Sequence, residues 1–273
     1  SSNYAEDLRI DYSILDQHAD SYRKIRNTFR YLLGNINDNF ESINFDTLDI
    51  NELPELEQLM LHKIYILNDN FKKYFSNYDF HNLYKELLNF CTVDLSAFYF
   101  DIRKDNLYCD PKDSKKRKST ILLLNIILNS LLKWFAPILS FTTEEIFKLL
   151  FKDQKSIHLE KFLKFPEKFK NQKLSEKWSE LIKIRNICNI SIEEKRASKE
   201  IGSSLEADLK IQLSQKLKNL TENINFSELC ITSKAEVYYK DSIETTAITT
   251  KAKGTKCPVC WKINELSCPR HSK

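Results

Sequence analysis

The sequence predicts a mainly α protein: an antiparallel helical bundle followed by a small α/β piece and a C-terminal metal-binding knuckle. Three observations predict this fold. Apolar residues recur at three- and four-residue steps from residue 12 to residue 151, they alternate after Gly202, and paired cysteine and histidine residues close the chain. The chain has 273 residues, of which 42% are hydrophobic, so it can bury one or two cores. Its three glycines lie far apart, which excludes a glycine-rich nucleotide loop.

The first helix is expected to begin at Asp11 or Ser13, either of which can cap it. An amphipathic stripe follows, made of Leu15, His18, Tyr22, Ile25, Phe29 and Leu32. On this stripe His18 is expected at the edge of the core, and Gly34 is expected to end the helix in a left-handed C-cap. An acidic loop over residues 35–53 comes next.

Four more helices are expected to complete the bundle. Pro54 suits the first turn of the second helix, and Asp79 caps a third helix that runs to Cys91. A long fourth helix starts near Lys115. Its apolar run over residues 121–139 is interrupted by polar residues and a proline, so it predicts a buried core helix rather than a membrane span. Thr142 and Glu145 form a capping box for a short fifth helix. We assign residues 10–160 to this bundle.

The pattern loosens over residues 156–169 and then predicts one more helix, over residues 174–196. Alternating apolar residues predict a strand over residues 205–213, and shorter runs predict strands at residues 229–231, 237–239 and 247–249. A helix over residues 214–223 fits between the first two strands. We assign residues 161–250 to this junction domain and residues 251–273 to the metal-binding tail.

The tail carries the ligand set and spacing of a structural zinc site. Cys257 and Cys260 form one pair, and Cys268 and His271 form the second pair after a short connector. Four protein ligands leave no open position, so one zinc ion would hold shape rather than activate water. The alternative is a frayed tail with unpaired thiols. The other four cysteines are scattered, which favours a reducing, cytoplasmic location over a disulfide framework.

Charge is unevenly distributed along the chain. Residues 1–60 carry twelve acidic and five basic side chains, although the whole chain has a net charge of +4. The excess of bases in the remainder suggests a polyanion as partner, and a codon bias towards lysine would produce the same excess. Arg23, Arg26, Asn27 and Arg30 share one edge of the first helix, where they can form a nucleic-acid-binding strip or a solvated face. No catalytic constellation emerges from the sequence.

Several stretches, in the same order over nearly the whole chain, resemble the C-terminal part of bacterial-type isoleucyl-tRNA synthetases. They include Ser1-Ser2-Asn3-Tyr4, Asp7-Leu8-Arg9-Ile10, Tyr22-Arg23-Lys24-Ile25-Arg26-Asn27-Thr28, Asn89-Phe90-Cys91-Thr92-Val93-Asp94, Ala136-Pro137-Ile138-Leu139, Ile201-Gly202-Ser203-Ser204 and Lys256-Cys257-Pro258-Val259-Cys260-Trp261. The chain departs from that family at its end, where the connector is short and His271 stands in place of a fourth cysteine.

The resemblance implies that the bundle is a class Ia anticodon-binding domain and that the tail grips the anticodon end of tRNA. The family's His-Ile-Gly-His and Lys-Met-Ser-Lys-Ser signatures and its editing domain are absent, so the resemblance implies a non-catalytic fragment of an ATP-dependent ligase. The implied partners are the anticodon stem-loop of isoleucine tRNA and an upstream catalytic domain of the same polypeptide. A monomer with no membrane association is expected.

Under this resemblance, cations would bind phosphate and planar groups would stack on bases. The expected tRNA-binding residues are Arg23, Arg26, Asn27, Arg30, Arg103, Lys104, Lys115, Lys116, Arg117, Lys118, Trp261 and Lys262. For Trp261 the alternative is that the indole only covers the metal cluster. For Lys115 to Lys118 the alternative is a solvated charge run. A free-standing RNA-binding module and a zinc-stabilised protein-binding scaffold also remain open as functions.

Overall fold

The computed structural model describes residues 3–4, 7, 10–36, 43–152, 155–241 and 244–271. The chain divides into two compact units, residues 1–171 and residues 172–273. The predicted motif residues Ser1, Ser2, Leu8 and Arg9, part of the acidic loop (residues 37–42) and the last two residues of the tail lie outside the described residues.

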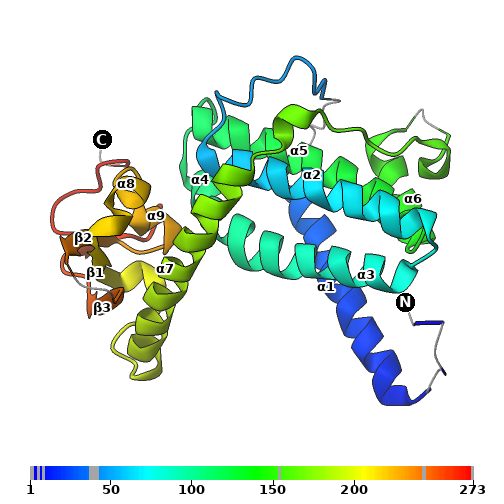
Figure 1. Ribbon diagram of the computed structural model, residues 1–273. Helices are drawn as coiled ribbons and strands as arrows, with labels where there is room; N and C mark the ends of the chain where they lie inside the picture. Colours follow the sequence, from blue (N-terminus) through cyan, green and yellow to red (C-terminus); the bar gives the residue numbers. More distant parts are fainter. Residues whose placement is uncertain are drawn as a thin grey trace. The chain divides into compact units, whose positions relative to one another are not determined.

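The first unit is the predicted helical bundle (Figure 1). Its helices are α1 (Tyr12–Ile36), α2 (Glu55–Ser76), α3 (Phe80–Asn89), the π-helix η1 (Phe90–Phe100), α4 (Asp101–Cys109), α5 (Lys115–Phe135) and α6 (Ser140–Leu150). Two short 3₁₀ turns follow, η2 (Ile157–Leu159) and η3 (Glu167–Phe169). The predicted cap at Asp79 is confirmed, because its side chain accepts a hydrogen bond from the Asn82 N–H.

Helix α5 forms the centre of this unit and contacts α1, α2, α4 and α6. Its apolar run is buried as predicted. The side chains that are 0% exposed include Leu124, Ile127, Leu131, Trp134 and Phe135. Within the described residues, no helix combines the length and apolar content needed to cross a membrane.

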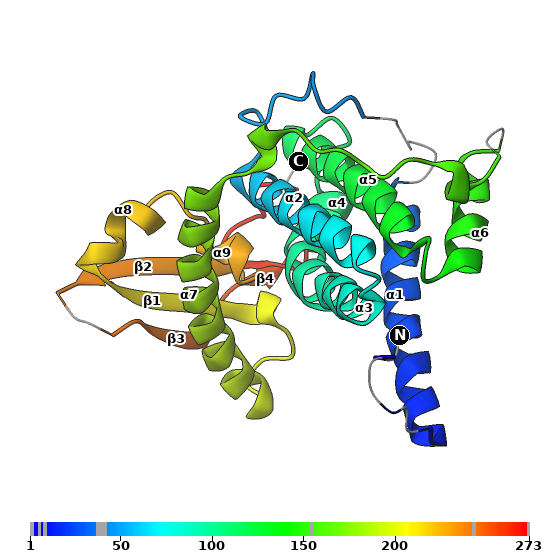
Figure 2. The ribbon, with the colours of Figure 1, turned by 45° about the vertical axis from the view of Figure 1, so that its right-hand side comes forward.

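Helix α1 differs from the prediction at both ends. Its core contacts begin only at Ile25, so Leu15 is 54% exposed and His18 is exposed rather than at the core edge. Gly34 does not end the helix, which continues to Ile36 because Leu32 and Ile36 are both buried in the bundle. In Figures 1 and 2 the first turns of α1 project beyond the other helices of the bundle.

The predicted capping box at α6 is wrong. The helix begins at Ser140, and Thr142 lies inside its first turn with its hydroxyl 3.0 Å from the Tyr22 hydroxyl of α1. The N-terminus of α6 has no side-chain cap, and Glu144, next to Glu145 of the predicted box, accepts hydrogen bonds from the side chain of Ser156 and the N–H of Ile157. The contact of Thr142 with Tyr22 therefore replaces the predicted cap.

The second unit places α7 (Gln172–Ala197) on one face of a three-stranded sheet in the order β2-β1-β3 (Figure 2). Its strands are β1 (Ala207–Ser214), β2 (Lys234–Lys240) and β3 (Thr246–Lys251), with β1 parallel to β2 and antiparallel to β3. The predicted alternation is confirmed, because Ala207, Leu209, Ile211 and Leu213 are all at most 1% exposed.

A 3₁₀ turn, η4 (Ser204–Glu206), precedes β1. The connection from β1 to β2 contains a second 3₁₀ turn, η5 (Gln215–Leu217), then α8 (Lys218–Thr221) and α9 (Phe226–Leu229). The strand expected at residues 229–231 is wrong. Asn225 caps α9 through the Glu228 N–H, and the Arg185 side chain of α7 donates to the Leu229 carbonyl at 2.9 Å. This apolar run is therefore the end of a one-turn helix fastened to α7.

Candidate metal centre and nucleic-acid surface

The four predicted metal ligands come together at the end of the second unit. A two-stranded hairpin, β4 (Thr255–Lys256) and β5 (Ile263–Asn264), presents Cys257 and Cys260 from its turn. Gly254 enters this hairpin with a φ of +120°, and a Cβ there would lie 2.1 Å from the Asn264 carbonyl oxygen. Only glycine fits at position 254, where the two strands of the hairpin come close together.

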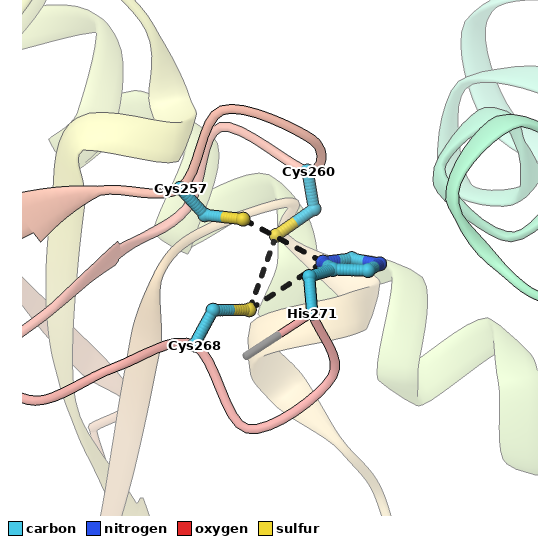
Figure 3. Close-up of side chains that lie close together, drawn as sticks. All are labelled: Cys257, Cys260, Cys268 and His271. Atoms are coloured by element: carbon cyan, nitrogen blue, oxygen red, sulfur yellow. Dashed lines mark hydrogen bonds between the residues drawn. The ribbon is translucent and has the colours of Figure 1, made fainter. Parts of the chain in front are cut away.

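The donor atoms of Cys257, Cys260, Cys268 and His271 lie within 4.8 Å of one another and point to one centre (Figure 3). The sulfurs of Cys260 and Cys268 are 3.8 Å apart, and His271 Nδ1 is 3.5 Å from the sulfurs of both Cys257 and Cys268. Zinc–sulfur bonds of about 2.3 Å and zinc–nitrogen bonds of about 2.0–2.1 Å imply tetrahedral edges of about 3.8 Å and about 3.6 Å. The cluster can hold a metal ion, and its spacing has the size of a tetrahedral site.

The electrostatics of the knuckle also suit a metal. The Cys260 backbone N–H, followed by that of Val259, lowers the pKa of the Cys257 thiol to about 6. This sulfur is therefore a thiolate at neutral pH, which is the form that binds metal. Burial instead raises the pKa of the Cys260 thiol, so this residue would release its proton on binding a metal ion. The Cys257 and Cys260 residues are 5% and 4% exposed, so the backbone rather than bulk water surrounds these donors.

Trp261, the next residue along, has a left-handed backbone with a φ of 63° and is 59% exposed. The Lys256 ammonium lies 5.5 Å from the centre of its ring. A bulky residue rarely adopts this conformation, and such strain tends to mark functional positions. The indole is thus an exposed plate beside the metal cluster, and Lys262 follows it half-buried.

In the first unit, the polar edge of α1 is solvent-facing as predicted. Arg23, Arg26, Asn27 and Arg30 are all exposed. Arg23 forms an exposed ion pair with Asp20 at 2.6 Å, whereas Arg26 and Arg30 have no ion-pair partner among the described residues. This edge therefore offers cations that the fold does not use internally.

Arg103 does not join this surface, and the prediction that it binds phosphate is corrected. Arg103 is 3% exposed and forms a two-pronged ion pair with the fully buried Glu57, at 2.6 and 2.7 Å. The adjacent Lys104 points outward and pairs with Asp101 at 2.6 Å. The two cations were grouped because they are neighbours in sequence, but successive helical positions point about 100° apart.

The basic run at the start of α5 lies beside acidic residues. Ser114 caps the helix through the Arg117 N–H, and the Arg117 guanidinium donates to the Asp110 carbonyl at 2.8 Å. Lys115 lies 3.5 Å from Glu52 of the acidic loop. A cavity here is lined by Asp49, Glu52, Asp113, Lys115 and Lys118. The charges of this run are partly balanced within the unit. Phosphate binding by Lys115, Lys116, Arg117 and Lys118 stays a prediction.

The structure also brings together residues that the sequence did not connect. Asn27 of α1 and Lys104 of α4 line one pocket, together with Lys24, Tyr31 and Tyr108. The aromatic content of residues 94–108 was the available signal. The winding that turns these side chains towards α1 could not be predicted from local spacing.

Comparison with known proteins shows the family to which the chain belongs. A family model described as the anticodon-binding domain of tRNA ligase matches residues 57–212. An isoleucine–tRNA ligase of Pelagibacter ubique is 70% identical over 272 residues, which is 100% of this chain and 30% of that protein. Isoleucine–tRNA ligases of Bartonella henselae and Agrobacterium fabrum are each 36% identical over 97% and 96% of this chain and 28% of their own lengths.

The chain thus spans 28–30% of the length of these relatives. The family match begins inside α2 and ends in β1, so it includes neither the arginines of α1 nor the knuckle. Since the match covers more than half of the residues, the chain belongs to the family of anticodon-binding domains of tRNA ligases.

Proposed function

We propose that this chain is the part of an isoleucine–tRNA ligase that recognises the anticodon end of isoleucine tRNA. The observation that carries the proposal is the exposed edge of α1, where Arg26 and Arg30 have no ion-pair partner among the described residues. Family membership and the 70% identity to an isoleucine–tRNA ligase support it, and they favour it over a free-standing RNA-binding module or a protein-binding scaffold.

The proposed chemistry follows from what an anticodon loop offers. Its phosphates attract cations, and its bases can leave the stack and be read on their edges. Arg23, Arg26 and Arg30 would neutralise phosphates, and the Asn27 amide would pair with a base edge. Trp261 would stack on a base, with Lys256 and Lys262 near the backbone.

We further propose that the metal held by Cys257, Cys260, Cys268 and His271 is one zinc ion. Three sulfurs and one imidazole are a ligand set that zinc favours, and the distances between the donor atoms fit its tetrahedral geometry. Bound zinc would supply structural rigidity to a tail with little apolar core. In this proposal the chain recognises tRNA as a monomer, and an upstream domain of the same polypeptide, which uses ATP, attaches isoleucine.

A charge-matched pair of variants tests the proposal. Arg26→Ala with Arg30→Ala removes two exposed cations from α1, and Lys72→Ala with Lys73→Ala removes two exposed lysines from α2. Affinity for isoleucine tRNA is measured against salt concentration. The α1 variant should weaken binding and flatten the slope of log affinity against log salt by about 1–2. The α2 variant should bind as the unchanged protein does. Equal effects of the two variants would remove α1 from the RNA-binding surface.

A further inference from the structure

A pocket of about 620 Å³ opens in the first unit between α1, η1 and α4. Side chains from all three elements line it, including Lys24, Asn27, Tyr31, Ser96, Lys104 and Tyr108. A volume of this size lies within the range of sites that hold a small ring-bearing ligand. The pocket therefore has room for one nucleotide, but not for a duplex.

The π-helical winding of η1 helps to create the pocket. Hydrogen bonds that span five residues widen the helix and bring Cys91, Ser96 and Asp101, each five residues apart, towards the same face. Of these, Cys91 is buried and Ser96 is exposed, and both side chains are small. A π-helix packs less favourably than an α-helix and is frequently found at functional sites. Here its eleven residues, Phe90–Phe100, pack against α1, and Asn27 of the exposed α1 edge lines the same pocket.

The walls of the pocket are aromatic. Tyr31 stacks on Phe100 with ring centres 4.2 Å apart and planes inclined by 21°. The Tyr31 hydroxyl is buried beside Tyr108. Burial, and then the neighbouring Tyr108, raise its pKa above the ordinary value, so the hydroxyl stays protonated at neutral pH. Tyr108 stands at the rim and is 64% exposed, which leaves its ring available for stacking.

The rim of the pocket is polar and carries cations. Lys24 is exposed and has no ion-pair partner among the described residues, and Lys104 is held by Asp101 at 2.6 Å. Asn27 adds an amide with both a donor and an acceptor. An aromatic plate beside ammonium groups is the arrangement that single-stranded nucleic acid uses.

From these contacts we infer that the pocket binds one unstacked base of an RNA loop. The base lies against Tyr108, Lys24 and Lys104 approach its phosphate, and Asn27 meets its edge. The inference rests on the proposed function and deepens it, because it names the place where a single base is held and assigns Tyr108 and Lys24 to RNA binding.

A steric block with a matched control tests the inference. Ser96 is exposed and lines the pocket, whereas Val93 is exposed on the same π-helix and does not line it. Ser96→Trp should fill the pocket and weaken binding of the anticodon stem-loop of isoleucine tRNA. Val93→Trp should leave binding unchanged. Since stacking on one base is worth about 1–3 kcal/mol, the expected loss for Ser96→Trp is about 5- to 150-fold.

A second pair guards against misfolding of the blocked variant. Tyr108→Ala should weaken binding within the same range, whereas Tyr12→Ala, which removes an exposed ring at the start of α1, should not. Binding is followed with a set of stem-loops, each of which carries the fluorescent base 2-aminopurine at a different loop position. The position whose base enters the pocket should lose its fluorescence change on binding in Tyr108→Ala and keep it in Tyr12→Ala.

The outcomes separate the two proposals. If the unchanged chain binds the stem-loop and both Ser96→Trp and Tyr108→Ala bind it equally well, the base pocket is overturned while tRNA recognition stands. If the unchanged chain binds neither the stem-loop nor the whole tRNA, the proposed function is overturned as well.

Discussion

Glu57 and Arg103 form an ion pair in the interior of the bundle, where both charged groups are removed from water. Glu57 is 0% exposed and also accepts a hydrogen bond from the Tyr99 hydroxyl at 3.0 Å. Taking both charges out of water is unfavourable, and their attraction offsets that loss only while both partners remain. The pair therefore serves packing of α2 against α4, not ligand binding.

We expect Arg103→Ala to lower the free energy of unfolding by about 3–5 kcal/mol, because it strands the Glu57 carboxylate without its partner. Lys104→Ala, one position along and exposed, should change it by no more than about 0.5 kcal/mol. Urea denaturation of the two variants checks this. Similar losses for both would mean that the ion pair is not buried as described.

Trp261 combines an exposed ring with a strained backbone. For a residue with a side chain, the left-handed conformation costs about 1–2 kcal/mol, and glycine is free of that penalty. The strain is retained although the ring is 59% exposed and packs little. Tyr78 combines a φ of 55° with 69% exposure in the same way, so a binding role for Trp261 rests on its place beside the metal cluster.

Two variants distinguish the backbone strain at Trp261 from stacking of its ring on a base. Trp261→Gly should retain metal against a chelator at least as well as the unchanged protein, because the hairpin relaxes, yet it should weaken tRNA binding. Trp261→Ala should weaken tRNA binding to a similar extent without that gain. Normal tRNA affinity in both variants, measured by titration, would leave the indole only a structural role.

At the scale of elements, we expect the knuckle to depend on the proposed metal, because its hairpin has only two-residue strands. Cys268→Ser should abolish stoichiometric metal binding and open the tail while β1, β2 and β3 remain folded. Cys109→Ser, which changes a half-exposed thiol outside the cluster, should keep one metal ion per chain. Elemental analysis and amide hydrogen exchange over residues 253–271 check both. Equal metal content in the two variants would contradict the assigned ligands.

Local patterns predicted some elements well. Helices α2 and α7 follow from regular apolar stripes, β1 follows from strict alternation, and the knuckle follows from ligands that are close in sequence. These signals involve few distant residues, so periodicity and spacing sufficed. The clustering of Cys257, Cys260, Cys268 and His271 was predictable for the same reason.

Other elements depend on contacts that the sequence does not display. Gly34 carries a stop signal, but burial of Ile36 extends α1 beyond it. Thr142 meets Tyr22 across the bundle, and residues 226–229 form a helix fastened by Arg185. The π-helix η1 packs against α1 and α3 and continues directly into α4, and no local pattern marks its winding or the pocket beside Tyr108. Arg103 looked available because its partner Glu57 lies far away in sequence.

At the scale of the whole molecule, part of the uneven charge is balanced inside the first unit. The acidic first part of the chain includes Glu52, which forms an ion pair with Lys115, so some of its negative charge is neutralised within the first unit. The unpaired cations of α1 and the exposed ring of the knuckle belong to different units, residues 1–171 and 172–273. In the proposed function both units bind the same tRNA.

The most direct test measures the affinity of the chain for isoleucine tRNA and for the same tRNA with an exchanged anticodon, over a range of salt. We expect both affinities to fall steeply with salt, because phosphate contacts release counterions. The native anticodon should bind at least about tenfold more tightly at every salt concentration, since reading one base is worth about 1–3 kcal/mol. Equal affinities for the two tRNAs would contradict anticodon recognition by this chain.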